Sequence, residues 1–154
     1  LAEGEEALAT IINGDAPAAM AGTCSALGIP LVHISSDYVF DGTGTVPWQP
    51  NDLTAPQCAY GRSKLVGEKA IRNSGVAHVI LRTSWVVSAH GGNFVKTMLR
   101  LSDTRDALNV VADQIGGATP ARDIAAACSR IAAHLIQDPS KSGTYHFGDT
   151  PDVS

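Results

Sequence analysis

Short apolar runs alternate with longer amphipathic segments along this chain. The apolar runs are uninterrupted and have the length of strands that are buried on both faces. They lie at residues 31–34, 77–81, 108–111 and 143–147. Apolar residues at helical spacing, together with Gly and Pro at the ends, predict helices at residues 5–28, 59–73, 94–101 and 119–137. Strands that alternate with helices indicate an α/β fold with a doubly wound parallel sheet, and a mixed α+β domain is the alternative.

Composition narrows the class of protein. A chain of 154 residues with 44% hydrophobic residues and a net charge of −4 is not disordered as a whole. It has no cluster of Lys and Arg, which argues against a nucleic-acid partner or a membrane surface, and no apolar run is long enough to span a membrane. The three scattered cysteines suit a reducing compartment, so we expect a cytoplasmic protein. The five histidines lack metal-ligand spacing, and no metal site is predicted.

Polar residues follow two of the predicted strands. Ser35-Ser36-Asp37-Tyr38 comes after the first strand, and Arg82-Thr83-Ser84-Trp85 comes after the second. In an open parallel sheet, ligands bind beyond the carboxyl ends of the strands. These residues therefore mark a candidate site, although Ser and Thr also end strands and cap the next element without any other role.

A tyrosine and a lysine four residues apart supply the candidate chemistry. Tyr60 and Lys64 lie on one face of the predicted helix at residues 59–73. An ammonium group near a phenol stabilises the phenolate, so the phenol becomes a better proton donor to a developing alkoxide. The Ser36 hydroxyl would hold a substrate carbonyl beside that phenol. Taken alone, the Tyr-Lys spacing is also compatible with an ordinary exposed helix.

Together these segments resemble the short-chain dehydrogenase/reductase superfamily and, within it, the dTDP-4-dehydrorhamnose reductase family. The resemblance extends from about residue 19 to residue 147. The matching segments are 35–42, 47–48, 55–56, 60–68, 81–86, 92–94, 97–101, 113–117 and 119–123. The resemblance implies a Rossmann-like domain and the reduction of the 4-keto group of a nucleotide-sugar, dTDP-4-dehydro-L-rhamnose, by NADPH or NADH.

The resemblance also implies roles for individual residues. Ser36 stands where the family has its catalytic Thr and keeps the hydroxyl. Tyr60 would protonate the C4 oxygen, and Lys64 would tune Tyr60 and hold the ribose of the cofactor. Thr83 would also contact the cofactor.

Four further residues are expected at the nucleotide-sugar. Tyr38 and Trp85 would line the sugar pocket, and Trp85 as a plain core aromatic is the alternative. Asn93 and Gln114 would contact the nucleotide-sugar, with a purely structural role equally open. Val87 stands where the family usually has Tyr, which leaves the identity of the substrate less certain.

One expected feature is absent from the sequence. The superfamily opens with a strand, a Gly-rich turn and a helix that binds the cofactor's pyrophosphate, and no such glycine pattern occurs here. We therefore expect residues 1–112 to be the C-terminal part of a Rossmann domain that is incomplete at its N-terminus. Residues 113–154 are expected to be a later, truncated segment of the Rossmann domain and the start of a smaller substrate domain. The strand at residues 31–34 should then lack one neighbour. The longer enzyme is expected to be a homodimer.

Two other functions stay open. One is a nucleotide-sugar epimerase or dehydratase of the same superfamily, against which Trp85 and Asn93-Phe94 argue. The other is a non-catalytic regulatory subunit that resembles the one of methionine adenosyltransferase. The combination of Ser36, Tyr60 and Lys64 favours an enzyme over a regulatory subunit, since a binding module needs no tuned phenol.

Overall fold

A three-stranded parallel sheet lies at the centre of this computed structural model, which describes residues 2–148. The strands are β1 (Leu31–Ser36), β2 (His78–Thr83) and β5 (Gly143–His146), in the spatial order β1-β2-β5. In the register of β1 and β2, Ser36 pairs with Thr83 at the carboxyl ends. The parallel sheet predicted from the apolar runs is confirmed.

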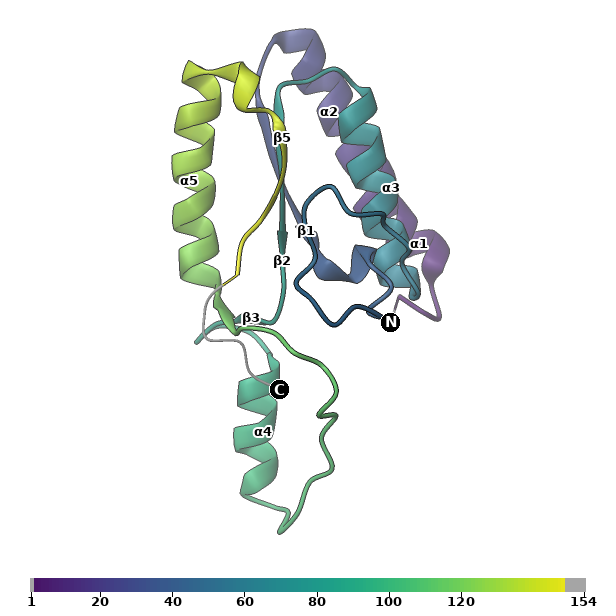
Figure 1. Ribbon diagram of the computed structural model, residues 1–154, viewed down its shortest axis with the longest axis vertical. Helices are drawn as coiled ribbons and strands as arrows, with labels where there is room; N and C mark the ends of the chain where they lie inside the picture. The colour runs from purple at the N-terminus through teal and green to yellow at the C-terminus, as the bar shows by residue number, and fades with distance from the viewer. Residues whose placement is uncertain (1, 149–154) are drawn as a thin grey trace.

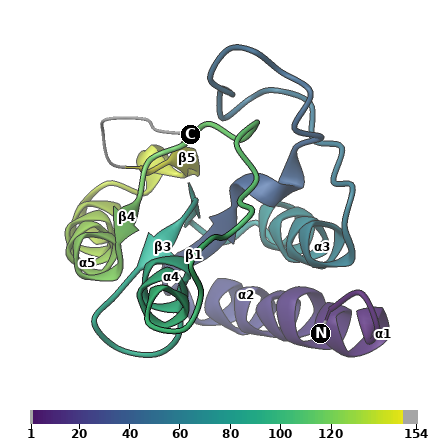
Figure 2. The ribbon, with the colours of Figure 1, turned by 90° about the horizontal axis from the view of Figure 1, so that it is seen from below.

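Helices cover both faces of the sheet (Figures 1 and 2). On one side are α1 (Glu6–Thr10), a π-helical segment (Ile11–Asp15), α2 (Ala16–Leu27) and α3 (Ala59–Asn73). On the other side is α5 (Ala121–Gln137). Side chains of β2 point alternately to the two helical layers. Ile80 packs with Ala21 of α2 and Ile71 of α3, whereas Val79 and Leu81 pack with α5. The doubly wound arrangement is therefore confirmed.

Helix α3 occupies the predicted residues. It begins at Ala59 because two side chains accept hydrogen bonds from backbone N–H groups of its first turn. The Cys58 Sγ accepts a hydrogen bond from the backbone N–H of Gly61, at 3.4 Å. The Glu3 carboxylate accepts one from the N–H of Ala59, at 2.7 Å. These groups satisfy N–H donors that an isolated helix leaves without partners. Part of the acidic N-terminal stretch thus fixes the start of α3.

The segment between β2 and α5 departs from the prediction. Helix α4 (Phe94–Ser102) follows β3 (Val86–Val87), which pairs in parallel with β4 (Thr119–Pro120). The predicted strand at residues 108–111 is wrong, because this segment finds no neighbouring strand and Val110 and Val111 are exposed. The helix start expected at Thr119-Pro120, with Pro120 as the first helical residue, is one residue early, since Thr119 and Pro120 pair with β3 and α5 begins at Ala121.

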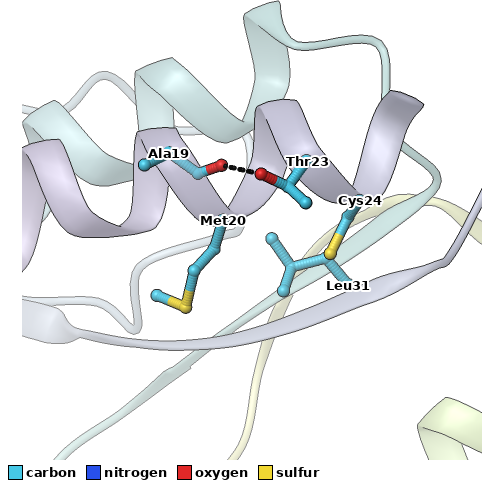
Figure 3. Close-up of a pocket in the computed structure, with 5 residues that line it drawn as sticks. All are labelled: Ala19, Met20, Thr23, Cys24 and Leu31. Carbon is cyan, nitrogen blue, oxygen red and sulfur yellow. Dashed lines mark hydrogen bonds between the residues drawn. The ribbon is translucent and has the colours of Figure 1, made fainter. Parts of the chain in front are cut away.

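One edge of the sheet is open. Within residues 2–148, β1 pairs only with β2, as expected for the strand at residues 31–34. Beside this edge is an apolar hollow in which Met20 and Cys24 of α2 approach Leu31 of β1 (Figure 3). Ile34 is exposed at the same strand. None of the helices in residues 2–148 has the length and apolar character that a membrane span requires.

Candidate active site

Two hydroxyl groups lie side by side at the carboxyl ends of β1 and β2. Ser36 and Thr83 are register partners, and both side chains are buried. The Ser36 Oγ donates a hydrogen bond to the Asp37 carboxylate, at 2.9 Å, and accepts one from the Tyr38 N–H, at 3.2 Å. Thr83 is only 7% exposed, and its Oγ1 has no hydrogen-bond partner among residues 2–148. A buried hydroxyl without a partner at a strand end is well suited to bind a ligand.

Two aromatic side chains stand over this strand end. The rings of Tyr38 and Tyr60 meet edge to face, with their centroids 5.8 Å apart. Gly61 makes this approach possible, because a Cβ at that position would lie 2.1 Å from the Tyr38 carbonyl oxygen. The first turn of α3 therefore presses against the short 3-10 helix of Asp37–Val39. The glycine after Tyr60 brings its phenol to the end of β1.

The environment of Tyr60 keeps its phenol protonated. Partial burial raises the pKa of Tyr60 above its ordinary value, and the nearby Ser36 hydroxyl opposes this effect without cancelling it. The carboxylate of Asp37 raises the pKa further. A protonated phenol that remains partly exposed can donate a proton to a bound ligand.

Lys64 is buried one turn further along α3 and faces β1. Its Nζ donates a hydrogen bond to the Ile34 carbonyl, at 2.6 Å, and lies 3.4 Å from the His33 Nε2. Burial lowers the pKa of Lys64, while the charge of Glu68 acts in the opposite direction. The ammonium is thus anchored to β1 next to the strand end that carries Ser36.

Glu68 and Arg82 form a buried ion pair that the sequence analysis missed. Arg82 Nε and Nη2 donate to the two carboxylate oxygens of Glu68, at 2.9 and 2.7 Å. Arg82 also donates to the Pro50 carbonyl at 3.1 Å, and its guanidinium lies 4.9 Å from the centre of the Phe40 ring. Burial alone would raise the pKa of Glu68, but the hydrogen bonds and charge of Arg82 outweigh it and lower the pKa. The continued spacing of four from Tyr60 through Lys64 to Glu68 was the available signal.

Trp85 lies at a strained position between β2 and β3. Its φ of 45° is in the left-handed region, which a bulky side chain rarely adopts. Its carbonyl accepts a hydrogen bond from the Thr119 N–H at 3.1 Å, and its ring faces Gly116, where a Cβ would come within 3.3 Å. Strain of this kind persists where surrounding contacts hold it, often at functional sites.

The remaining two predicted residues differ in their surroundings. The Asn93 side chain caps α4 by accepting from the Lys96 N–H, and it donates to the Ser88 carbonyl. Gln114 is exposed in the segment between α4 and β4. Within residues 2–148, no three His, Cys, Asp or Glu side chains gather as ligands for a metal ion.

Comparison with known proteins places this geometry in a family. The family model of the RmlD substrate binding domain matches residues 1–154. A dTDP-4-dehydrorhamnose reductase from Sinorhizobium fredii is 47% identical over 155 aligned positions, which cover 99% of this chain and 52% of that protein. One from Salmonella typhimurium is 43% identical, with 95% and 49% covered.

A solved structure agrees with these relatives. The crystal structure of dTDP-4-dehydrorhamnose reductase from Bacillus anthracis in complex with NADP has a TM-score of 0.90 and 37% identity, over 99% of this chain and 53% of that one. The chain spans about half the length of the curated relatives it matches. The resemblance noted in the sequence and the Rossmann-like fold are both confirmed, and the chain belongs to the RmlD substrate binding domain family.

Proposed function

We propose that this chain carries the catalytic centre of an NAD(P)H-dependent reductase that converts dTDP-4-dehydro-L-rhamnose to dTDP-L-rhamnose. The observation that carries the proposal is the grouping of the Tyr60 phenol, the Ser36 hydroxyl and the unpartnered Thr83 hydroxyl at one end of the sheet. The relatives named as this reductase support the choice of substrate.

The residues at the strand ends suit a nicotinamide cofactor. The buried Thr83 hydroxyl has no hydrogen-bond partner among residues 2–148 and can bind such a ligand, and the Lys64 ammonium retains one N–H donor for a ribose hydroxyl. NADPH or NADH would supply the hydride that reaches C4 of the sugar. NADP is bound in the Bacillus anthracis relative, which supports the same class of cofactor here.

The protein side of the reaction is a proton transfer. On substrate binding, the Ser36 hydroxyl would turn its one O–H from Asp37 to the C4 carbonyl oxygen of the substrate. Tyr60 then gives its phenolic proton to that oxygen as negative charge develops, so the ketone becomes a secondary alcohol. The positive charge of Lys64, one turn further along α3, would stabilise the phenolate that remains. Because burial keeps Tyr60 protonated, it starts the reaction in the required form.

Four residues are proposed to contact or shape the nucleotide-sugar site. The exposed ring of Tyr38 and the strained Trp85 would form apolar walls for the sugar. Gln114, exposed beside the Trp85 contact at Gly116, would donate to the nucleotide-sugar. The Asn93 amide is engaged with Ser88 and Lys96, so we propose that Asn93 acts through the loop that it holds.

We further propose that the activity requires residues beyond this chain. The relatives are about twice as long, and β1 has an open edge beside the apolar hollow of Met20, Cys24 and Leu31. A parallel strand from the rest of the protein would cover that edge. In this proposal residues 1–112 belong to the Rossmann domain, and residues 113–154 are a later segment of the Rossmann and substrate domains, because α5 and β5 still belong to the layers of the sheet. A homodimer and a cytoplasmic location belong to the same proposal, which sedimentation and fractionation test.

The test is NADPH oxidation by the longer enzyme with dTDP-4-dehydro-L-rhamnose, with the product identified by NMR. Tyr60→Phe should reduce kcat by about 100-fold or more while the KM for the nucleotide-sugar changes little. Tyr145→Phe is the matched control, because the hydroxyl of Tyr145 on β5 donates to the carbonyl of Lys141, which lies outside the candidate site. Unchanged turnover in Tyr60→Phe would remove Tyr60 from the mechanism. Isomerised sugar without net NADPH oxidation would identify an epimerase instead.

A further inference from the structure

The buried ammonium of Lys64 is held by neutral groups. Within residues 2–148, no carboxylate lies within 4.0 Å of its Nζ, although the residue is only 9% exposed. Its two close partners are the Ile34 carbonyl at 2.6 Å and the His33 Nε2 at 3.4 Å, both on β1. A buried cation usually has an anionic partner, so this arrangement calls for an explanation.

A neutral acceptor does something that a carboxylate cannot do. A carboxylate beside Lys64 would fix the ammonium and also cancel its field at the neighbouring phenol. A neutral imidazole fixes the ammonium and leaves the field intact. Two of the three N–H donors then point at β1, and one is left for a ligand.

The surroundings keep His33 in the neutral form that this task requires. Burial and the positive charge of Lys64 lower the pKa of His33 from 6.5 to about 4, although the Glu68 carboxylate opposes the shift. The pairing of His33 with Ile80 of β2 adds no charged group, and Arg82 of the same strand is committed to Glu68. Because an ammonium can only donate, the Nε2 that faces Lys64 acts as the acceptor in this arrangement, which assigns the imidazole proton to Nδ1.

We propose that His33 is a positioning residue that holds the Lys64 ammonium without neutralising its charge, so that one N–H of Lys64 remains for the cofactor. This inference rests on the proposed function, since it assigns a task to Lys64 in that reaction. The spacing in the sequence is simple: His33 lies three residues before Ser36 on β1, so one strand carries both the anchor of Lys64 and the hydroxyl at the site.

The experiment compares His33→Leu with His33→Gln in the longer enzyme. Leucine removes the acceptor, whereas glutamine keeps a neutral one. Leu should lower kcat/KM for NADPH by roughly tenfold, as for the loss of a hydrogen bond to a charged group, and Gln should restore most of it. His78→Leu is the matched control, because His78 lies at the opposite end of the sheet from Ser36.

A second measurement is independent of activity. A small acylating reagent that reacts with unprotonated amines labels Lys64, and the extent of labelling across pH, followed by mass spectrometry, reports the pKa of Lys64. The exposed Lys69 of the same helix is the internal reference. His33→Leu should shift the Lys64 labelling curve to lower pH, because the charged form loses a partner. His33→Gln should keep it near the wild-type curve. Glu68 on α3, Tyr60 on α3 and Arg82 on β2 are unchanged in all variants.

The outcomes separate the two proposals. Equal labelling curves in wild type and His33→Leu would overturn the role of His33, whatever the activity. Failure of His33→Gln to restore kcat/KM while it restores the labelling curve would also overturn it, since anchoring Lys64 would then not govern the reaction. Wild-type protein that reduces no nucleotide-sugar would refute the proposed function, and the positioning role in catalysis with it, while the labelling arm still reports the contact between His33 and Lys64.

Discussion

The ion pair between Glu68 and Arg82 provides a quantitative test of how α3 is fixed on the sheet. Glu68→Leu removes the carboxylate that accepts two hydrogen bonds from Arg82, at 2.9 and 2.7 Å, and one from Arg72, at 2.5 Å. The side chains are 0% and 3% exposed, so water cannot replace the lost partner of Arg82. A buried charge left without its partner is strongly destabilising.

The magnitude follows from this burial. Breaking a buried pair by removing one partner costs about 3–5 kcal/mol, which is a large part of the roughly 5–15 kcal/mol that stabilises a typical domain. Arg82→Met should also be destabilising, since it leaves Glu68 with only the partly exposed Arg72 as an ionic partner and loses the contacts to Pro50 and Phe40. The double variant replaces both charges by apolar groups. Its cost should be smaller than the sum of the single costs by about 2 kcal/mol or more.

Urea unfolding of the longer enzyme, with all four members of the cycle, measures these free energies. The control is the pair between Glu6 and Arg62, which is also 2.7 Å long and also involves α3 but whose side chains are 45% and 44% exposed. Glu6→Gln should change the free energy of unfolding far less, because solvent screens an exposed pair. Additive costs in the Glu68 and Arg82 cycle would refute the reasoning, as would equal costs for the buried and the exposed pair.

Three further predictions concern stability. Gly61→Ala should destabilise the protein by about 2 kcal/mol or more, because the new Cβ meets the Tyr38 carbonyl. Gly22→Ala on α2, where a new Cβ meets no atom, should stabilise the protein by about 1 kcal/mol, and thermal melts distinguish the two variants. His33 should make the protein less stable as the pH falls from 6.5 to about 4, because the unfolded chain binds the proton first, and His33→Gln should flatten this part of the denaturation profile. Residues 1–154 expressed alone should self-associate through the open edge of β1. A monomer in sedimentation experiments that also unfolds cooperatively on heating would contradict the proposed missing strand.

The sequence was sufficient to predict most of the sheet and its helices. Apolar runs located β1, β2 and β5, and the helix predicted at residues 59–73 matches α3. Both β1 and β2 continue two residues beyond their apolar runs, to Ser36 and Thr83. Backbone hydrogen bonding extends a strand regardless of the polarity of its side chains, so hydropathy alone ends these strands too early.

Other features depend on contacts that one sequence does not reveal. Leu108 to Val111 has the composition of a strand, but a strand needs a neighbour, and in the structure Val110 and Val111 are exposed. Conversely, β3 and β4 are only two residues long and exist because they pair with each other. The left-handed conformation of Trp85 is likewise imposed by tertiary contacts, since no local signal favours it in a tryptophan.

The face of α3 explains why a catalytic pair and a structural ion pair occur on one helix. Tyr60, Lys64 and Glu68 follow at intervals of four, and their exposed fractions fall from 39% through 9% to 0%. The helix therefore carries the reactive phenol of Tyr60 where solvent and ligands can reach it, and the ion-paired carboxylate of Glu68 where it is fully buried. An apolar contact at Glu68 would stabilise α3 as well, but Lys64 has to stay charged between these two positions. Burial lowers the pKa of Lys64, and the charge of Glu68 opposes this shift without touching Lys64; Arg82 keeps Glu68 ionised, so the buried pair helps Lys64 to stay charged.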